Sequence, residues 1–419
     1  MKKLLTIVFA LMLAIFACVS CGDGESKKEK VGEVEILPAL TLEEPDYSGI
    51  TIPETFKIGV ICLHDETSTY DKNFIDAVKR ALVDLKMNAD TQLLLKVNVK
   101  ENADCTEAAN KLVTEGCNLI FADSFGHEKF LKETAEKNPN VVFCHATGTN
   151  AVSYGLDNFY NAFASIYEGR YLAGVAAGLK LKEMYGDKDG NVSDANAKIG
   201  YVGAYTYAEV ISGYTSYYLG VKSIVPNVKM DVKFTGSWFD ISREKSTAQS
   251  LIEGGCKIIS QHADSMGAPS ECEEKGVPNI SYNVSTYESC SETFLISSAI
   301  NWTPYFKHII TQTVKGERIT QNYVGTLKTG SVILSKLNGD VAAEGTVAKL
   351  VEVRDKLVNG TLHVFDTANF TVNGQKVTTH NVAGLGEAVI NGIFEESKLR
   401  SAPYFDLKID GITLLNEEV

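Results

Sequence analysis

Short apolar runs alternate with amphipathic segments through the first third of the chain. Four runs have the length of buried strands, namely Lys57–Leu63, Leu93–Val99, Asn118–Ala122 and Val141–His145. Three segments between them repeat apolar residues every three or four positions, as in a helix with one buried face, and these are Asn73–Leu85, Thr106–Thr114 and Glu128–Lys137. Strands and helices in this alternation predict a parallel sheet covered by helices.

The alternation restarts after a long helix expected at Ile166–Leu181. This helix is rich in glycine and alanine, which suits close packing, for example where two lobes meet. Further strands are expected at Lys198–Gly203, Val228–Thr235, Lys257–Gln261, Asn279–Tyr282 and Phe294–Ser298. Further helices are expected at Glu209–Ile224, Arg243–Glu253, Ala268–Lys275 and Tyr305–Lys315. The repeated pattern predicts a second parallel sheet.

The last quarter of the chain has a different pattern. The alternating segment Thr326–Leu337 favours antiparallel strands, and Ala343–Leu357 favours a helix. Leu362–Val377 has the pattern of a hairpin with Asn373 and Gly374 at its turn, a pair that favours a tight two-residue turn.

These elements predict an α/β fold with two doubly wound parallel-sheet lobes joined by a hinge and followed by a C-terminal extension. The expected parts are a signal peptide at 1–20, a tether at 21–55, a first lobe at 56–165, a second lobe at 166–293, a return to the first lobe at 294–322, and an α+β part at 323–419 that completes the first lobe and the hinge region. Parallel sheets bind ligands beyond the carboxyl ends of their strands, so two facing sheets form a cleft that can close.

The N-terminal segment predicts export and a lipid anchor. Lys2 and Lys3 precede an apolar run, Leu4–Ala17, that is shorter than the roughly 20 residues needed to span a bilayer. Small residues then lead to Cys21, as before a signal-peptidase cut. The segment resembles a bacterial lipoprotein signal, which implies that Cys21 carries the lipid and that the protein is extracytoplasmic and anchored to the cell membrane. Cys18 is the alternative anchor.

The charge of the chain limits its possible binding partners, and its cysteine pattern bears on disulfide bonds. The chain has 40 Lys and Arg against 53 Asp and Glu, a net charge of −13, so we expect no binding to nucleic acid and no membrane contact beyond the N-terminal lipid. Seven cysteines follow Cys21, scattered and without CxxC spacing, and we expect them to be buried and unpaired. A disulfide between Cys272 and Cys290 is left open. We expect a monomer.

The loops after the predicted strands carry aromatic and short polar side chains. These loops are His64–Phe74, Asp123–Glu128, Ala204–Glu209, Gly236–Asp240, His262–Pro269 and Asn283–Tyr287. Nine residues are candidate ligand contacts: Tyr70, Asp71, Phe74, Asp123, Ser124, Tyr205, Trp238, Asp264 and Asn283. Other roles are the alternatives for five of them, with Phe74 in the core, Asp71 and Asp264 as helix N-caps, Asn283 in a turn and Tyr205 at the rim of the site. His64–Glu66 is expected to be a solvated or hinge loop.

This mixture favours a flat, uncharged ligand with many hydrogen-bonding groups. Aromatic faces stack on planar rings, and carboxylates accept hydrogen bonds from ring N–H or sugar hydroxyl groups. An anionic ligand would need Arg, Lys or a glycine-rich phosphate loop, and neither G-x-G-x-x-G nor G-x-x-x-x-G-K-[ST] occurs. The spacing of His262, Asp264 and Cys272 does not match a metal site, and we expect no metal and no cofactor.

Several longer segments together resemble one known family. They are Ser68–Phe74, Tyr167–Gly178, Lys198–Tyr205, Gly213–Pro226, Gly236–Asp240, Ser260–Pro269 and Ile300–Phe306. This set is similar to the basic membrane protein (BMP) family of ABC-transporter substrate-binding lipoproteins, which includes purine-nucleoside-binding members, over about Lys57–Asn322. The resemblance implies a fold like that of the type I periplasmic binding proteins, a purine nucleoside or nucleobase as ligand, and an ABC permease as partner.

The resemblance also implies roles for individual residues. In the family a purine is clamped between aromatic rings from the two lobes, at positions that match Phe74 and Trp238 here. Ile75 stands where the nucleoside binders have Asn, and Asn283 stands where they commonly have Asp. The loop His262–Ser265 resembles a branch that also binds free bases, so the choice between nucleoside and base stays open.

The leading hypothesis is a binding protein and not an enzyme, which captures a purine by hinge closure and delivers it to the permease. The alternatives are the same fold with a sugar, a furanoid signal or an amino acid as ligand, and an exported nucleosidase. An amino acid would need a cationic clamp for its carboxylate, which these loops do not show. A nucleosidase would need a nucleophile and a base, and no third group is evident to orient Ser265 and His262.

Overall fold

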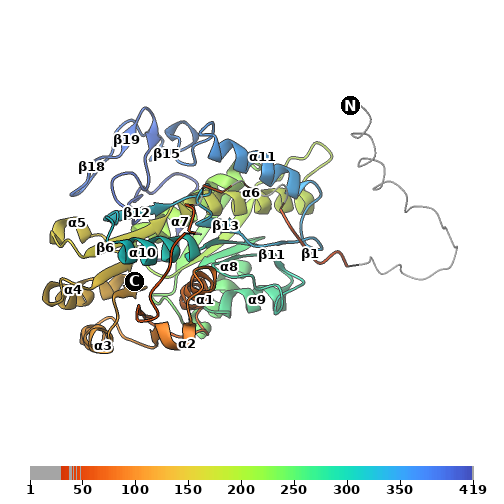
Figure 1. Ribbon diagram of the computed structural model, residues 1–419. Helices are drawn as coiled ribbons and strands as arrows, with labels where there is room; N and C mark the ends of the chain where they lie inside the picture. The colour runs from red at the N-terminus through yellow and green to blue at the C-terminus, as the bar shows by residue number, and fades with distance from the viewer. Residues whose placement is uncertain (1–29, 37–39, 41, 44, 48, 418–419) are drawn as a thin grey trace, which may run out of the picture. The chain divides into compact units, whose positions relative to one another are not determined.

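The computed structural model describes residues 30–36, 40, 42–43, 45–47 and 49–417. The chain divides into two compact units, Met1–Lys30 and Val31–Val419, and the second unit holds the two lobes (Figure 1). The signal peptide, Cys18 and Cys21 lie outside the described residues, so the lipid anchor stays a prediction. Among the described helices, none combines the length and apolar character needed to cross a membrane.

The first lobe is built on a six-stranded parallel sheet. Its strand order is β12 (Asn322–Gly325), β6 (Phe159–Ala164), β5 (Val142–Ala146), β4 (Leu119–Ala122), β2 (Ile58–Ile61) and β3 (Leu93–Lys96). The helices of this part of the chain are α1 (Thr69–Asp84), α2 (Ala89–Gln92), α3 (Ala103–Thr114), the short 3-10 helix η1 (Phe125–His127), α4 (Glu128–Lys137) and α5 (Ala151–Tyr154). Every neighbouring pair of these strands is parallel, as the alternation predicts.

Burial on both faces explains the continuous apolar runs of these strands. All four residues of β2 are buried. Val60 packs in the core that includes α1, whereas Ile61 packs in a separate core that includes α3. Helix α3 lies so close to the sheet that a Cβ atom on Gly59 would come within 2.7 Å of the Leu112 side chain. Glycine at this position therefore permits the approach.

The second lobe is built on a seven-stranded sheet. Its strand order is β13 (Val332–Leu334), β11 (Phe294–Ile300), β10 (Asn279–Tyr282), β9 (Ile259–His262), β7 (Lys198–Gly203), β8 (Lys229–Phe234) and β21 (Ile412–Leu414). Its helices are α6 (Ile166–Tyr185), α7 (Ala208–Lys222), α8 (Ile241–Glu253) and α9 (Gly267–Lys275). Only the edge strand β13 is antiparallel to its neighbour in this sheet. The expected pair of doubly wound lobes is confirmed.

The glycine-rich helix α6 packs backbone to backbone against α7. A Cβ atom on Gly174 would lie 2.2 Å from the carbonyl oxygen of Tyr217, and one on Gly220 would lie 2.1 Å from that of Tyr171. Any side chain larger than hydrogen would force the two helices apart. The small residues of α6 thus serve close packing, as expected, but the partner helix belongs to the second lobe.

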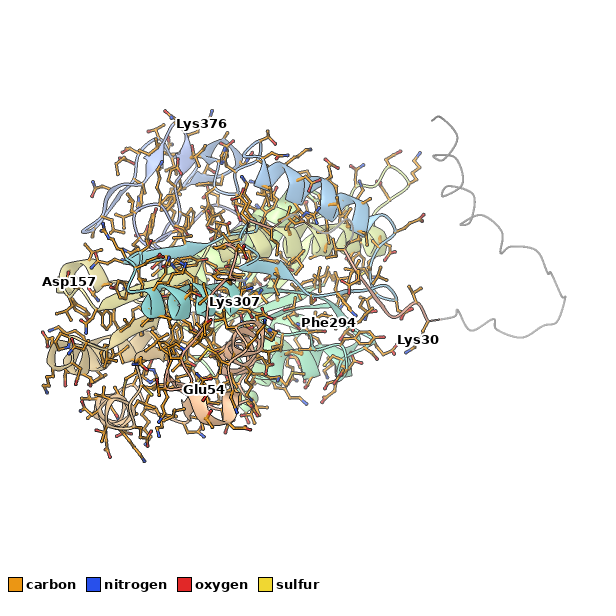
Figure 2. The ribbon with its side chains drawn as sticks, in the orientation of Figure 1. Lys30, Glu54, Asp157, Phe294, Lys307 and Lys376 are labelled. Carbon is orange, nitrogen blue, oxygen red and sulfur yellow. The ribbon has the colours of Figure 1, made fainter. Side chains whose placement is uncertain are left out.

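The chain returns to the first lobe later than position 294, so the expected return at 294–322 is wrong in its first part. Strand β11 pairs with β10 and β13 in the second sheet, and Figure 2 labels Phe294 there and Lys307 on helix α10 (Thr303–Lys315). Helix α10 is the element that returns, since Thr303 contacts α1 through the carbonyl of Ala77 at 3.4 Å. An apolar strand run carries no information about which sheet it joins.

The C-terminal part completes both lobes, where the sequence predicts only the first. It supplies β12 to the first sheet and β13 and β21 to the second. The remaining elements are β14 (Leu337–Asn338), α11 (Thr346–Val358), η2 (Thr367–Asn369), β15 (Thr371–Val372), β16 (Gln375–Lys376), β17 (Asn381–Val382), β18 (Gly386–Glu387), β19 (Val389–Ile390) and β20 (Ile393–Phe394). The predicted hairpin turn is confirmed, with Asn373 at φ 51° and Gly374 at φ 75° between β15 and β16.

The tether expected at 21–55 is attached to the fold from Val31 onward. The backbone N–H groups of Val31 and Gly32 donate to the Asp340 carboxylate at 2.7 and 2.9 Å. Strand β1 (Glu33–Val34) then pairs antiparallel with β14. The polar composition of this segment predicts a solvated chain, but backbone pairing depends on the partner strand and is independent of composition.

The seven cysteines that follow the signal segment are all buried and unpaired. Cys272 and Cys290 therefore form no disulfide. Burial raises the pKa of the Cys144 thiol to about 12, which keeps it protonated and unreactive. The prediction that these residues are buried and unpaired is confirmed.

We expect Gly174→Ala to lower the free energy of unfolding by at least about 2 kcal/mol, because the added methyl group overlaps the Tyr217 carbonyl oxygen. Urea unfolding would measure the change. Gly49→Ala is the matched control, since nothing lies within 4 Å of a Cβ atom there. Because alanine favours helix over glycine by about 1 kcal/mol, a stabilised Gly174→Ala protein would contradict the backbone contact.

Candidate ligand site between the two lobes

A cavity lies where the carboxyl ends of strands from the two sheets face each other. It holds about 390 Å³ of space between protein atoms, part of it open to solvent. The first lobe lines it with Leu63, His64, Tyr70, Asp71, Ser124, Phe125 and Thr147, and the second lobe lines it with Glu209, Trp238, His262, Asp264 and Tyr282. Open α/β sheets bind ligands at this edge, so the cavity is the candidate site.

The structure brings together five of the nine candidate contacts at this cavity. They are Tyr70, Asp71, Ser124, Trp238 and Asp264. Trp238 is half-buried, with the ring of Tyr205 edge-on to it at 5.2 Å between centroids. Tyr205 stacks in turn on Tyr207 at 5.3 Å, so it supports the tryptophan from behind and does not itself line the cavity. Ligand contact by all nine residues stays a prediction.

Phe74 belongs to the core of the first lobe and does not line the cavity. Its side chain is fully buried and stacks on Trp302 with 4.5 Å between ring centroids. It contacts the edge of Tyr70 at 4.9 Å, and Tyr70 is the aromatic residue that lines the cavity. Of the two roles weighed for Phe74, the geometry favours the core, with the phenylalanine positioning the tyrosine.

Asp71 and Asp123 lie close together in the first lobe, in different charge states. Burial opposes ionisation of Asp71, but hydrogen bonds from His64 and Ser68 outweigh it and lower its pKa. Asp123 lies behind the cavity wall, and its backbone carbonyl accepts from the Tyr70 hydroxyl at 2.8 Å. Burial, together with the nearby charge of Asp71, raises the pKa of Asp123 well above its usual range. One carboxylate thus faces the cavity, and a neutral carboxyl group lies behind it.

The second lobe places Asp264 at the cavity and not at the N-cap of helix α9, which is Met266. Helix α9 begins at Gly267, whose N–H donates to the Ser265 hydroxyl at 3.0 Å. Burial, reinforced by the charge of Glu244, raises the pKa of the Asp264 carboxyl well above its usual range. A neutral Asp264 can donate a hydrogen bond as well as accept one. The ligand-contact role predicted for Asp264 therefore fits the geometry better than the N-cap role.

A buried cation lies behind the second-lobe wall. The Arg170 guanidinium stacks on the Tyr282 ring at 3.5 Å from its centroid and donates to the Gln261 carbonyl at 2.8 Å. Burial, followed by the positive charge of Arg170, lowers the pKa of His262. His262 lies 3.4 Å from the Glu209 carboxylate and is a neutral hydrogen-bonding group. The walls of the cavity thus offer polar groups of both donor and acceptor type.

Several contacts between described residues join the two lobes across the cleft. The backbone N–H and the hydroxyl of Thr69 donate to the Asp264 carbonyl at 2.9 and 3.0 Å. The ring of Phe125 lies 5.5 Å from that of Tyr207, and the ring of His64 lies 5.4 Å from that of Phe239. The conformation is therefore a closed one, in which residues at the start of α1 touch the second lobe directly.

Sequence reasoning missed several residues that line the cavity. They are Leu63, His64, Phe125, Thr147, Glu209, His262 and Tyr282. His64 is partly buried and faces the second lobe, which fits the hinge alternative for the His64–Glu66 loop better than the solvated one. Tyr282 could have been predicted as a cavity residue, because it lies at the carboxyl end of a predicted strand. Thr147 has a φ of 62°, which is rare for a β-branched residue and typical of functional sites, but no sequence signal reveals it.

Asn283 has the geometry of a turn residue. Its φ is 64°, a left-handed conformation that asparagine tolerates, and its N–H donates to the Ser298 carbonyl at 3.0 Å. Its side-chain nitrogen is buried without a partner among the described residues. The turn role weighed for Asn283 therefore has direct support, and the side chain does not line the cavity.

Two α/β lobes with a cleft at the carboxyl ends of their strands form the fold that is seen in solute-binding proteins. A solved ABC-transporter solute-binding protein from Conexibacter woesei aligns with a TM-score of 0.57 and 16% identity, over 74% of this chain and 98% of that one. The family model for the PnrA-like substrate-binding proteins of ABC transporters, Bmp, matches residues 58–368. The chain belongs to the Bmp family.

Curated relatives of this chain include proteins with different printed ligands. A purine-binding protein of Brucella abortus is 29% identical over 293 residues, which are 69% of this chain and 79% of that protein. A putative ABC-transporter glucose-binding protein of Haloferax volcanii is 27% identical over 271 residues, which are 65% of each chain. Membership of the family identifies an ABC-transporter substrate-binding protein, and proteins of this class are extracytoplasmic.

We expect the stability of the loop under Asp264 to fall as pH rises. Glu244 is buried and accepts from the N–H of Ser265 at 3.2 Å, and burial raises its pKa to about 7. The folded protein therefore holds a proton that the unfolded chain releases near the ordinary glutamate pKa. This contribution to stability is complete at low pH and is lost as pH rises through about 7.

Glu244→Gln cannot ionise and removes this dependence. Relative to wild type, its free energy of unfolding should rise by up to about 3 kcal/mol between pH 5 and pH 8, as measured by urea unfolding. Glu253→Gln, at an exposed position on the same helix, is the control and should follow the wild-type profile. Parallel profiles for wild type and Glu244→Gln would contradict the assignment.

Proposed function

We propose that this protein is a lipid-anchored solute-binding subunit of an ABC importer that captures a purine nucleoside or nucleobase between its lobes. Closure of the hinge encloses the ligand, and the closed protein delivers it to a membrane permease. The lipid is on Cys21, and the chain acts as a monomer without covalent chemistry. The observation that carries the proposal is the cavity itself, in which one aromatic face meets buried polar groups from both lobes.

The shape and chemistry of the walls favour a planar, uncharged ligand. Trp238 supplies a flat aromatic surface from the second lobe, and Tyr70 supplies a phenol ring from the first. Stacking on such a ring contributes about 1–3 kcal/mol per base in other systems. The ionised Asp71 accepts hydrogen bonds, whereas a neutral Asp264 can also donate one. A purine presents ring N–H donors and ring nitrogen acceptors, which match both.

Closure of the lobes has a direct physical route in this structure. Thr69 lies at the first position of α1 and donates to Asp264 of the opposite lobe, so the two sides of the site are linked when the cleft is shut. A ligand that contacts Asp71 and Asp264 together binds the closed conformation more tightly than the open one. Such differential affinity shifts the population toward the closed state.

One curated relative supports a purine as the ligand of this protein, and another supports a sugar as the alternative ligand. The purine-binding protein of Brucella abortus supports a purine for this chain, whereas the putative glucose-binding protein of Haloferax volcanii supports a sugar. A sugar would stack one face on Trp238 and use the same carboxyl groups for its hydroxyls. The residue types in the cavity fit both ligand classes, so a binding experiment is needed to distinguish a purine from a sugar.

We expect a purine to raise the melting temperature of the purified full-length chain, because a ligand that binds only the folded state stabilises it by mass action. At a concentration of 100 times the dissociation constant the gain is about 2.7 kcal/mol. The panel contains adenosine, guanosine, inosine, their free bases, ribose, glucose and amino acids. A shift with a sugar or an amino acid and with no purine would reject the purine and keep the fold.

Trp238→Ala should weaken purine binding at least tenfold, because it removes the aromatic face from the cavity wall. Titration calorimetry would measure the dissociation constant. Tyr185→Ala, at the far end of α6, is the control and should bind with wild-type affinity. Unchanged affinity in Trp238→Ala, with a cooperative melting transition, would remove the tryptophan from the site.

A further inference from the structure

A group of side chains of the types that bind metals lies inside the first lobe, at and behind the wall of the ligand cavity. Cys62 follows strand β2, Asp71 lies in the first turn of α1, and Asp123 follows strand β4. One sulfur or oxygen atom from each lies within 4.8 Å of those from the other two. All three side chains are at most 1% exposed. Thiolate and carboxylate groups are ligands of divalent transition metals.

His127 supplies an independent observation that points to a ligand. Its ring is fully buried, and Nε2 lies 2.8 Å from the carbonyl oxygen of Val99. Because a carbonyl can only accept, Nε2 carries the proton and Nδ1 carries a free lone pair. Nδ1 lies 4.0 Å from Asp123 Oδ1 and has no hydrogen-bond partner among the described residues. Histidines that bind metals commonly donate their other N–H to a backbone carbonyl in this way.

One carboxyl group of the cluster, that of Asp123, also has an oxygen without a hydrogen-bond partner among the described residues. Asp123 Oδ1 accepts from the Leu63 N–H at 3.2 Å, whereas Oδ2 is buried and has no partner among the described residues. Two imidazole rings lie close to these carboxyl groups. His64 Nδ1 lies 3.4 Å from Asp71 Oδ2, and His127 Nδ1 lies 4.0 Å from Asp123 Oδ1. A divalent cation that binds this buried oxygen would displace the proton that burial favours on the Asp123 carboxyl group.

We propose that Cys62, Asp71 and Asp123 bind a divalent transition metal such as Zn²⁺, and that the His127 ring, whose Nδ1 lies 4.0 Å from Asp123 Oδ1, moves in to complete the ligand set when the metal binds. Four protein ligands make a closed, structural site. Asp71 also lines the ligand cavity, so the metal would fix one carboxylate of the cavity wall. The proposal does not depend on which solute the cavity binds.

Cobalt titration of the purified full-length chain, after removal of bound metal with a chelator, tests the site. A bond between Co²⁺ and a thiolate gives an intense charge-transfer absorption in the near ultraviolet, and we expect it to saturate at one equivalent and to be displaced by Zn²⁺. Cys62→Ser should abolish this absorption. Cys144→Ser is the matched control, because Cys144 is equally buried on strand β5 of the same sheet and should leave the absorption unchanged.

Competition with a zinc chelator gives the affinity, and Asp123→Asn and His127→Gln should each weaken Zn²⁺ binding at least tenfold. If Cys62→Ser does not fold, Asp123→Asn decides the question, since it replaces one oxygen by nitrogen at constant shape. Absence of cobalt absorption in wild type, absorption that persists in Cys62→Ser, or unchanged Zn²⁺ affinity in Asp123→Asn would each overturn the proposal. Purine-induced melting shifts are recorded separately, so the failure of one proposal is distinguishable from the failure of the other.

Discussion

The two lobes form one site because the segments that cross between them are hydrogen-bonded to one another. Ser165, which leads into α6, donates its N–H to the Gly325 carbonyl at 2.8 Å, and Asn301, which leads into α10, donates its N–H to the Ser331 carbonyl at 2.8 Å. The Asn301 side chain adds a bond to the Gly330 carbonyl at 3.0 Å. These bonds hold the carboxyl ends of both sheets on either side of the same cleft. The positions of the residues that line the cavity depend on this arrangement of the lobes.

The spacing of apolar residues was sufficient to predict the helices and strands of the fold, but not to predict which sheet each strand joins. Each expected helix corresponds to an observed one, and α4 has the predicted bounds, because burial of one face imposes a pattern that the sequence must carry. The sheet that a strand joins is decided by contacts distant in sequence. The apolar run at Phe294–Ile300 therefore gave the strand correctly and its lobe incorrectly. The same limit hid the pairing of Glu33–Val34 with β14.

The candidate site was predictable to the level of loops but not of individual side chains. Parallel-sheet topology places the residues after each strand at one edge, and this was enough to select Asp71, Trp238 and Asp264. It could not distinguish Tyr70, which lines the cavity, from Phe74, which packs on Trp302 one helical turn further on. Nor could it bring Cys62 and Asp123 together, since 60 intervening residues separate the two strand ends and only the pairing of β2 with β4 makes them neighbours.

The buried thiols give the molecule a set of internal markers. Cys62, Cys105, Cys117 and Cys144 lie in the first lobe, and Cys256, Cys272 and Cys290 lie in the second. A reagent in solution reaches such a thiol only when the surrounding structure opens. The rate at which each cysteine is modified therefore reports how often the structure around it opens. The opening rates of the two lobes can thus be measured separately without an added label.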